Sequence, residues 1–161
     1  MKNNTSNIVQ GALIAALYTM LTVISNMFGL ASGVIQIRLS EALTILPVFT
    51  PAAIPGLFVG CIISNIITGC MPLDVVFGAI ATLIGAYGTY LLRRKSMLSL
   101  APPIVANTLI VPWILSIVYA FEGSVVYFTA TVFIGELISA GVLGYILRRT
   151  ITPYLDRIEW K

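Results

Sequence analysis

Charged side chains are scarce in this sequence. They make up 9% of its 161 residues, whereas 58% are hydrophobic; a soluble domain has about one quarter charged residues. The scarcity excludes an ordinary soluble domain and predicts an integral membrane protein that forms a single transmembrane domain over residues 1–161. The net charge of +3 does not indicate nucleic-acid binding, because the basic residues stand at the ends of apolar segments, where membrane orientation places them.

Histidine is absent and cysteine is rare. Histidine is the usual general base and a common metal ligand, so its absence removes both roles. Cys61 and Cys70 lack metal-ligand spacing and are interpreted as small apolar residues. The sequence also has no glycine-rich phosphate loop and no carboxylate pair at metal-binding spacing. We therefore expect no catalytic residue, no metal site and no cofactor bound by this chain, and ATP-driven uptake would need another subunit.

The basic residues predict the topology. They stand in three clusters, at Lys2, Arg93–Lys95 and Arg148–Arg149. If all three face the cytoplasm, an even number of crossings separates each pair. Three prolines divide the apolar region 41–69 into a short and a longer helix, because proline stops or kinks a helix. We therefore predict an all-α membrane protein with six transmembrane helices and both termini cytoplasmic.

The predicted helices are Ile8–Phe28, Glu41–Val48, Pro55–Gly69, Asp74–Leu92, Ala101–Phe121 and Val125–Leu147. The second of these is too short to cross a membrane unassisted, since about twenty residues are needed. Five crossings plus a re-entrant segment is therefore the alternative topology.

Glu136 stands near the middle of the otherwise charge-free stretch Val125–Leu147. An ionisable side chain at that depth costs on the order of 2.5–3.5 kcal/mol by insertion scales. Such a residue faces a protein interior or a wet cavity, where a partner or ligand satisfies it. We interpret Glu136 as a ligand-binding candidate. The alternative is that it only bonds neighbouring helices, for instance through Ser139 or a residue of the helix Ala101–Phe121.

The other charges away from segment ends lie on the predicted outer side. Arg38 and Glu41 are three residues apart and pair on one helix face if that helix begins early. Asp74 begins the helix Asp74–Leu92, along which small residues recur at helical spacing. These charges are ligand candidates. The alternatives are an interfacial Arg38–Glu41 ion pair, a helix-capping role for Asp74, and a small-residue stripe that serves packing alone.

The segment Ala101–Phe121 adds Asn107 and Trp113 within its span and Tyr119 near its outer end. Aromatic faces for stacking, together with carboxylates that accept N–H donors, suit a small, flat, polar ligand. A packed tryptophan that needs one hydrogen bond explains Trp113 equally well. An ion-coupled transporter is the competing class, because a membrane-embedded glutamate also exchanges protons. The sequence shows no inverted repeat that would support it.

Three blocks of sequence resemble the signature of the QueT family. They are Gln36–Pro47 (QIRLSEALTILP), Pro51–Cys61 with the following Asn65, and Leu73–Gly78. Ile37 stands where the family pattern is often aromatic, which is a conservative change. The resemblance covers about residues 8–150.

This resemblance implies a substrate-binding (S) component of an energy-coupling-factor (ECF) transporter in the cell membrane, dedicated to queuosine precursors, the 7-deazaguanine bases. It implies a six-helix bundle with a ligand site near the outer face, formed by the last three helices and the loop after the first. A separate module of one transmembrane coupling protein and two ATPases would supply the ATP-derived energy. An S component for another vitamin is a further alternative.

The resemblance assigns a role to two alanines, and the chemistry of the implied ligand suggests roles for the other candidates. Ala12 and Ala16 match an Ala-x-x-x-Ala that contacts the coupling protein in such S components, and small residues at this spacing let helices approach closely. Two of the carboxylates of Glu41, Asp74 and Glu136 would bind the donor groups of the ligand. The ligand carbonyl would contact Asn107, Asn65 or Arg38. Stacking would fall to Trp113 or Tyr119.

Overall fold

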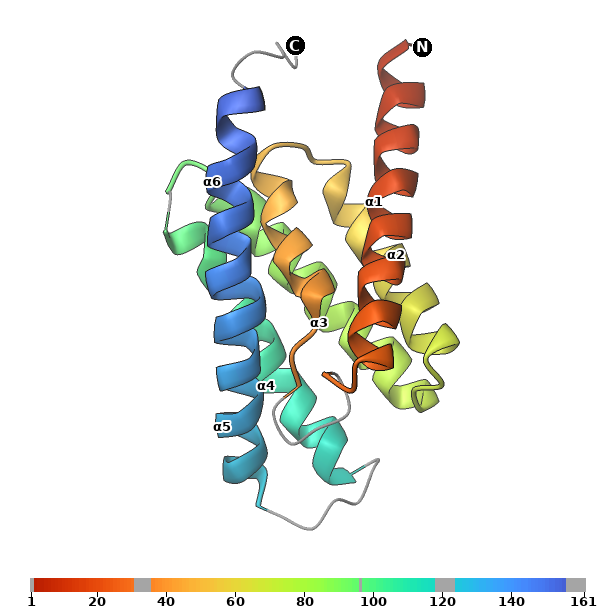
Figure 1. Ribbon diagram of the computed structural model, residues 1–161, viewed down its shortest axis with the longest axis vertical. Helices are drawn as coiled ribbons and strands as arrows, with labels where there is room; N and C mark the ends of the chain where they lie inside the picture. Colours follow the sequence, from red (N-terminus) through yellow and green to blue (C-terminus); the bar gives the residue numbers. More distant parts are fainter. Residues whose placement is uncertain (1, 31–35, 96, 118–123, 156–161) are drawn as a thin grey trace.

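The computed structural model describes residues 2–30, 36–95, 97–117 and 124–155, and the regular secondary structure in this part of the chain is all helical, without strands. Figure 1 shows the helices side by side in one bundle. In chain order they are α1 (Lys2–Met27), the 3-10 helix η1 (Leu39–Val48), α2 (Ala53–Ile67), α3 (Pro72–Leu91), the short 3-10 helix η2 (Leu98–Leu100), α4 (Ala101–Ile117), α5 (Val125–Glu136), the π-helix η3 (Leu137–Leu143) and α6 (Gly144–Leu155).

Each of the six predicted segments is a helix over its described residues; the end of the segment Ala101–Phe121, after Ile117, lies outside them. Pro51 lies between η1 and α2, so the predicted division of this region is confirmed. The last predicted helix is one continuous run of α5, η3 and α6. Among the described residues, four helices are long and apolar enough to cross a membrane, whereas η1 and α2 are shorter apolar helices. The all-helical fold is thus confirmed, together with four candidate spans.

The basic clusters gather at one end of the bundle. The first residues of α1 and the last residues of α6 lie at the same end in Figure 1. The Arg148 guanidinium donates a hydrogen bond from Nη1 to Ser99 Oγ at 2.9 Å, which joins the third basic cluster to the connection that follows the second. This arrangement agrees with three clusters on one membrane side.

The helix η1 lies in the centre of the bundle, with α1 on one side and the α5–α6 run on the other (Figure 1). It packs against α1, α3, η3 and α6. Its prolyl residue, Pro47, is fully buried. Because η1 is surrounded, the polar groups at its beginning face the interior rather than lipid.

Small residues bring α1 and α2 into close contact. A Cβ added at Gly56 would lie 2.6 Å from the carbonyl oxygen of Gly11, and one at Gly60 would lie 2.9 Å from that of Ala15. Gly11 and Ala15 are therefore used for packing inside the bundle. Ala12 and Ala16, one position further along, are exposed on the outer face of α1.

The small-residue stripe of α3 serves two purposes along its length. Towards the end of α3, a Cβ at Gly85 would meet the Cα of Pro103 at 2.7 Å, and Thr89 Oγ1 donates to the Ser99 carbonyl at 3.0 Å. This half packs against the beginning of α4. The other half, with Asp74 and Thr82, lines a cavity.

Candidate ligand-binding site

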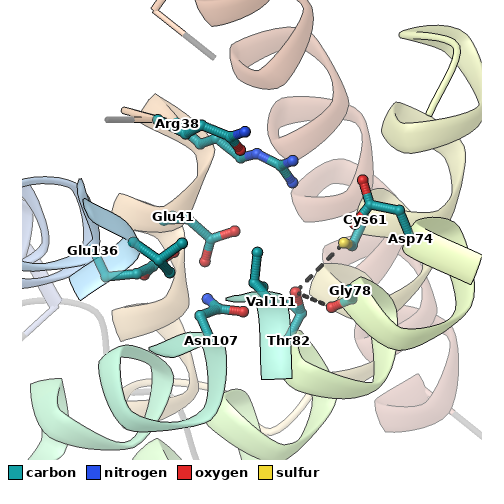
Figure 2. Close-up of a pocket in the computed structure, with 11 residues that line it drawn as sticks. Arg38, Glu41, Cys61, Asp74, Gly78, Thr82, Asn107, Val111 and Glu136 are labelled. Atoms are coloured by element: carbon teal, nitrogen blue, oxygen red, sulfur yellow. Dashed lines mark hydrogen bonds between the residues drawn. The ribbon is translucent and has the colours of Figure 1, made fainter. Parts of the chain in front are cut away.

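A cavity of about 30 Å³ lies where η1 meets α2, α3, α4 and α5. Such a volume holds only a few water molecules. Its walls carry most of the charged side chains that the sequence places away from helix ends (Figure 2). The lining residues are Gln36, Arg38, Glu41, Cys61, Asp74, Gly78, Thr82, Asn107, Val111, Val132 and Glu136.

Two carboxyl groups meet on one side of the cavity. Glu41 is 3% exposed, and its Oε1 accepts a hydrogen bond from the Tyr18 hydroxyl at 2.5 Å. Within the described part of the chain, Glu41 Oε2 and Glu136 Oε2 are both buried without a hydrogen-bond partner. Asn107 lies beside both carboxyl groups (Figure 2). Two open acceptors in one cavity suit a ligand with N–H donors, since an unsatisfied buried polar atom costs about 1–3 kcal/mol.

The alternative interpretation of Glu136, a bond to a neighbouring helix, is represented among the described residues by Asn107 on α4, which lies beside the carboxyl group, and not by Ser139. Ser139 Oγ is itself buried without a partner. Glu136 ends α5 and Ser139 lies in the π-helix that follows. π-Helical turns often occur at functional sites.

Arg38 extends across the opposite side of the cavity. Its backbone is extended (φ −104°, ψ 110°), because η1 begins only at the next residue. The guanidinium points away from Glu41 and towards Asp74 in Figure 2, and Nη1 lies 3.5 Å from Asn65 Oδ1. An ion pair of Arg38 and Glu41 on one helix face would have required η1 to begin earlier. The described residues do not form this pair.

Asp74 lies in the first turn of α3 and is 6% exposed. It does not begin the helix as predicted, since Met71 takes the N-cap position and Pro72 follows it. A carboxylate in the first turn is favoured by the helix dipole. Its side chain reaches the same cavity as Arg38. The cavity therefore contains three carboxyl groups and one guanidinium.

Polar groups on α2 and α3 complete this wall. Thr82 Oγ1 donates to the Gly78 carbonyl at 3.0 Å and contacts Cys61 Sγ at 3.4 Å (Figure 2). Asn65 is 1% exposed and does not line the cavity itself. Its amide contacts Cys61 Sγ at 3.7 Å and Arg38 at 3.5 Å. The structure thus places Asn65 behind the wall, where it contacts two residues that line the cavity.

Trp113 does not line this cavity, contrary to the sequence-based expectation. Its side chain is 58% exposed. At 100° per residue, Trp113 lies about 240° around α4 from Asn107, whereas Val111 lies only about 40° away. Trp113 belongs to a separate apolar groove of about 340 Å³ between α3 and α4. The second stacking candidate, Tyr119, lies outside the described residues.

Several lining residues were not predicted from sequence. Val111 and Val132 lie four residues from Asn107 and Glu136 on the same helix faces, so helical spacing was a usable signal. Gln36 begins the first family-like block but carries no charge that singles it out. Only the folded chain shows that a Cβ at Gly135 would collide with the Gln36 carbonyl oxygen. The backbone of Gln36 therefore packs directly against α5, the helix that carries Glu136.

The fold and the site together define the class: this is a multi-pass helical membrane protein with a small, buried cavity lined by carboxyl groups. A family model described as QueT transporter matches residues 8–153, so the chain belongs to the QueT transporter family.

The chain is also similar to one curated protein of this family. The chain is 36% identical over 83 residues to the queuosine precursor transporter QueT of Lactococcus lactis subsp. cremoris, and this match covers 52% of the chain and 48% of that protein. The matched segment is thus about half the length of the relative. No solved structure matches the chain.

Proposed function

We propose that this protein is the substrate-binding component of an ECF-type importer for queuosine precursors, 7-deazaguanine bases such as queuine or its aminomethyl precursor. Membership of the QueT transporter family and the similarity to a queuosine precursor transporter support a transporter of this substrate class. The observation that carries the proposal is the pair of open carboxylate oxygens, on Glu41 and Glu136, in one buried cavity.

The chemistry of a deazaguanine fits the lining of this cavity. Its ring N–H and exocyclic amino group are donors for Glu41 and Glu136. Its carbonyl oxygen accepts from Asn107, which lies beside both carboxyl groups. Arg38 lies opposite, near Asp74, and is a second donor. Three carboxyl groups against one guanidinium also favour a ligand that carries a cation, such as an aminomethyl group.

Binding requires the walls of the cavity to move. Ligand pockets measure about 300–1,000 Å³, whereas this cavity measures about 30 Å³. Gln36 and Arg38 line it from a segment without regular helical structure. We expect this segment to withdraw when a ligand binds, because the other walls are helices packed against neighbouring helices.

The proposed energy source lies outside this chain. A coupling protein would contact α1 through Ala12 and Ala16, and two ATPase subunits would hydrolyse ATP. Gly11 and Ala15 pack against α2, so Ala12 and Ala16 point to the other side of α1 and are exposed. An apolar groove of about 360 Å³, lined by Ala12, Pro55 and Val59 among others, runs beside them. The proposed topology has six crossings with both termini cytoplasmic.

Two measurements test the proposal. The purified protein is titrated with queuine, the aminomethyl and cyano precursors, guanine, thiamine and biotin; tight binding of a deazaguanine without response to the vitamins is expected. The protein is then reconstituted alone in vesicles, where it should bind this substrate without accumulating it. Preference for a vitamin would instead indicate an S component of different specificity.

A second candidate function is ion-coupled transport. The observation in its favour is that Glu41 and Glu136 share a buried cavity, an arrangement suited to proton exchange within a membrane. Accumulation of substrate by the lone protein, driven by an imposed proton gradient, would establish this function and remove the need for ATPase partners.

A further inference from the structure

Helix α1 is joined to the beginning of η1 by three hydrogen bonds. Tyr18 donates to Glu41 Oε1 at 2.5 Å, and Thr22 Oγ1 donates to Ser40 Oγ at 2.8 Å. Ser25 Oγ accepts from the Leu39 backbone N–H at 2.9 Å. The three donors or acceptors on α1 are spaced four and three residues apart, so they lie along one helix face. This row of bonds ends at the cavity.

Tyr18 is the end of this row and is rigidly packed. The side chain is 1% exposed and belongs to the core cluster that also contains Leu57 and Cys61. A Cβ at Gly60 would lie only 2.9 Å from the Tyr18 Cβ, so α2 closes over the residue. A ring held in this way places its hydroxyl at a defined point. Glu41, by contrast, has a long side chain with three rotatable bonds.

We propose that Tyr18 is a positioning residue for ligand binding. Its hydroxyl holds one oxygen of Glu41 and thereby directs the other, Oε2, into the cavity. Tyr18 itself does not line the cavity, so its effect on the ligand passes through Glu41. This inference rests on the proposed function, because it assigns Glu41 a role in binding.

The positioning role makes α1 a part of the binding machinery. At 100° per residue, Ala16 and Ala12 lie about 200° and 240° around α1 from Tyr18. One helix therefore holds a ligand-binding carboxylate on its inner face and presents the two alanines on its outer face. A displacement of α1 moves Tyr18 relative to Glu41.

The first test compares Tyr18→Phe with Thr22→Val. Each substitution removes one hydroxyl from the inner face of α1 and keeps the shape of the side chain. Thr22 is similarly buried, at 3% exposed, but contacts Ser40 rather than Glu41. We expect Tyr18→Phe to weaken the binding of queuine about tenfold, or about 1.4 kcal/mol, and Thr22→Val to change it less than about twofold. Equal losses in both variants, or unchanged affinity in Tyr18→Phe, would overturn the proposal.

The second test needs no ligand. The reagent is dicyclohexylcarbodiimide, an apolar compound that modifies membrane-buried carboxyl groups. It is applied to native membranes before extraction, so that the stability of the variants in detergent does not affect the result. Mass spectrometry measures labelling at Glu41 and, as the internal reference, at Glu136. Tyr18→Phe should raise labelling of Glu41 severalfold without changing Glu136, and Thr22→Val should change neither.

The two tests separate the inference from the proposed function. A wild-type protein that binds no deazaguanine contradicts the proposed function, while the labelling still decides whether Tyr18 restrains Glu41. Unchanged labelling of Glu41 in Tyr18→Phe, or a parallel increase at Glu136, would show that Tyr18 does not hold this carboxyl group.

Discussion

The polar cavity and the apolar groove beside it differ in size and in chemistry. The groove, which contains Trp113, measures about 340 Å³ and is lined by seven apolar residues. The cavity measures about 30 Å³ and is lined by three carboxyl groups and a guanidinium. In a soluble protein the larger apolar hollow is the default binding site. In a membrane, lipid covers such a groove at little cost, whereas buried charges require a partner. The cavity is therefore our candidate site because of its chemistry and not because of its volume.

The two faces of helix α1 differ in the same way, since one is polar and the other is apolar. Its inner face carries Tyr18, Thr22 and Ser25, and each forms a hydrogen bond to η1. Its outer face carries exposed apolar residues, including Leu13 at 61%. These polar groups are bonded inside the bundle, so between residues 12 and 20 the exposed side chains that lipid or a partner helix meets are apolar. Substitutions on the two sides should therefore have separable effects.

The largest expected effect concerns the outer face of α1. Ala16→Leu should abolish uptake by the assembled transporter while leaving the dissociation constant of the isolated protein nearly unchanged. A leucine holds helices apart that approach closely through small residues. Uptake in cells and ligand titration of the purified protein are measured together. Ala130→Leu, which alters an exposed alanine on α5, is the matched control and should retain uptake. Strongly weakened binding in Ala16→Leu with the partner still attached would place the outer face within the site.

Inside the cavity, Glu136→Gln should reduce affinity at least tenfold, or about 1.4 kcal/mol. The amide keeps the shape of the side chain but loses the charge and half of the acceptor capacity. Affinity and melting temperature are determined on one preparation. An unchanged dissociation constant with a shifted melting temperature would show that Glu136 stabilises the bundle and does not bind ligand.

Gly135→Ala should weaken binding severalfold, because the new methyl group collides with the Gln36 carbonyl and displaces a residue that lines the cavity. Gly141→Ala is the control in the same helical run, since its Cβ would meet side chains at an ordinary 3.5 Å. Titration of both variants is the measurement. Equal affinities would mean that the contact between Gln36 and Gly135 does not shape the site.

The smallest effect is expected in the groove. Trp113→Leu should change affinity less than about twofold, because the indole faces away from the cavity. The substitution keeps an apolar side chain towards lipid. A loss of tenfold or more on titration would instead support the stacking role predicted from sequence and would require the ligand to reach the groove.

Much of the fold could be predicted because it depends on local properties. Apolar length predicted the helical segments, and the prolines predicted the break between η1 and α2. The cavity carboxylates Glu41, Asp74 and Glu136 were also identifiable, since charges are conspicuous among apolar residues. Trp113 was misplaced because its depth in the helix was considered without its direction around the helix axis. The pairing of Arg38 with Glu41 was not predictable because it depended on where η1 begins, whereas Arg38 itself lines the cavity.

The sequence by itself thus determined a helical membrane protein, the approximate extent of its helical segments and the few residues that need a polar partner. Hydrophobicity and proline act within one segment, so no knowledge of neighbouring helices is required. Only the tertiary structure decided that Tyr18 donates a hydrogen bond to Glu41, 23 residues away, and that the backbone of Gln36 packs against Gly135. Such contacts depend on the mutual rotation of packed helices, which the pattern of any single helix leaves open.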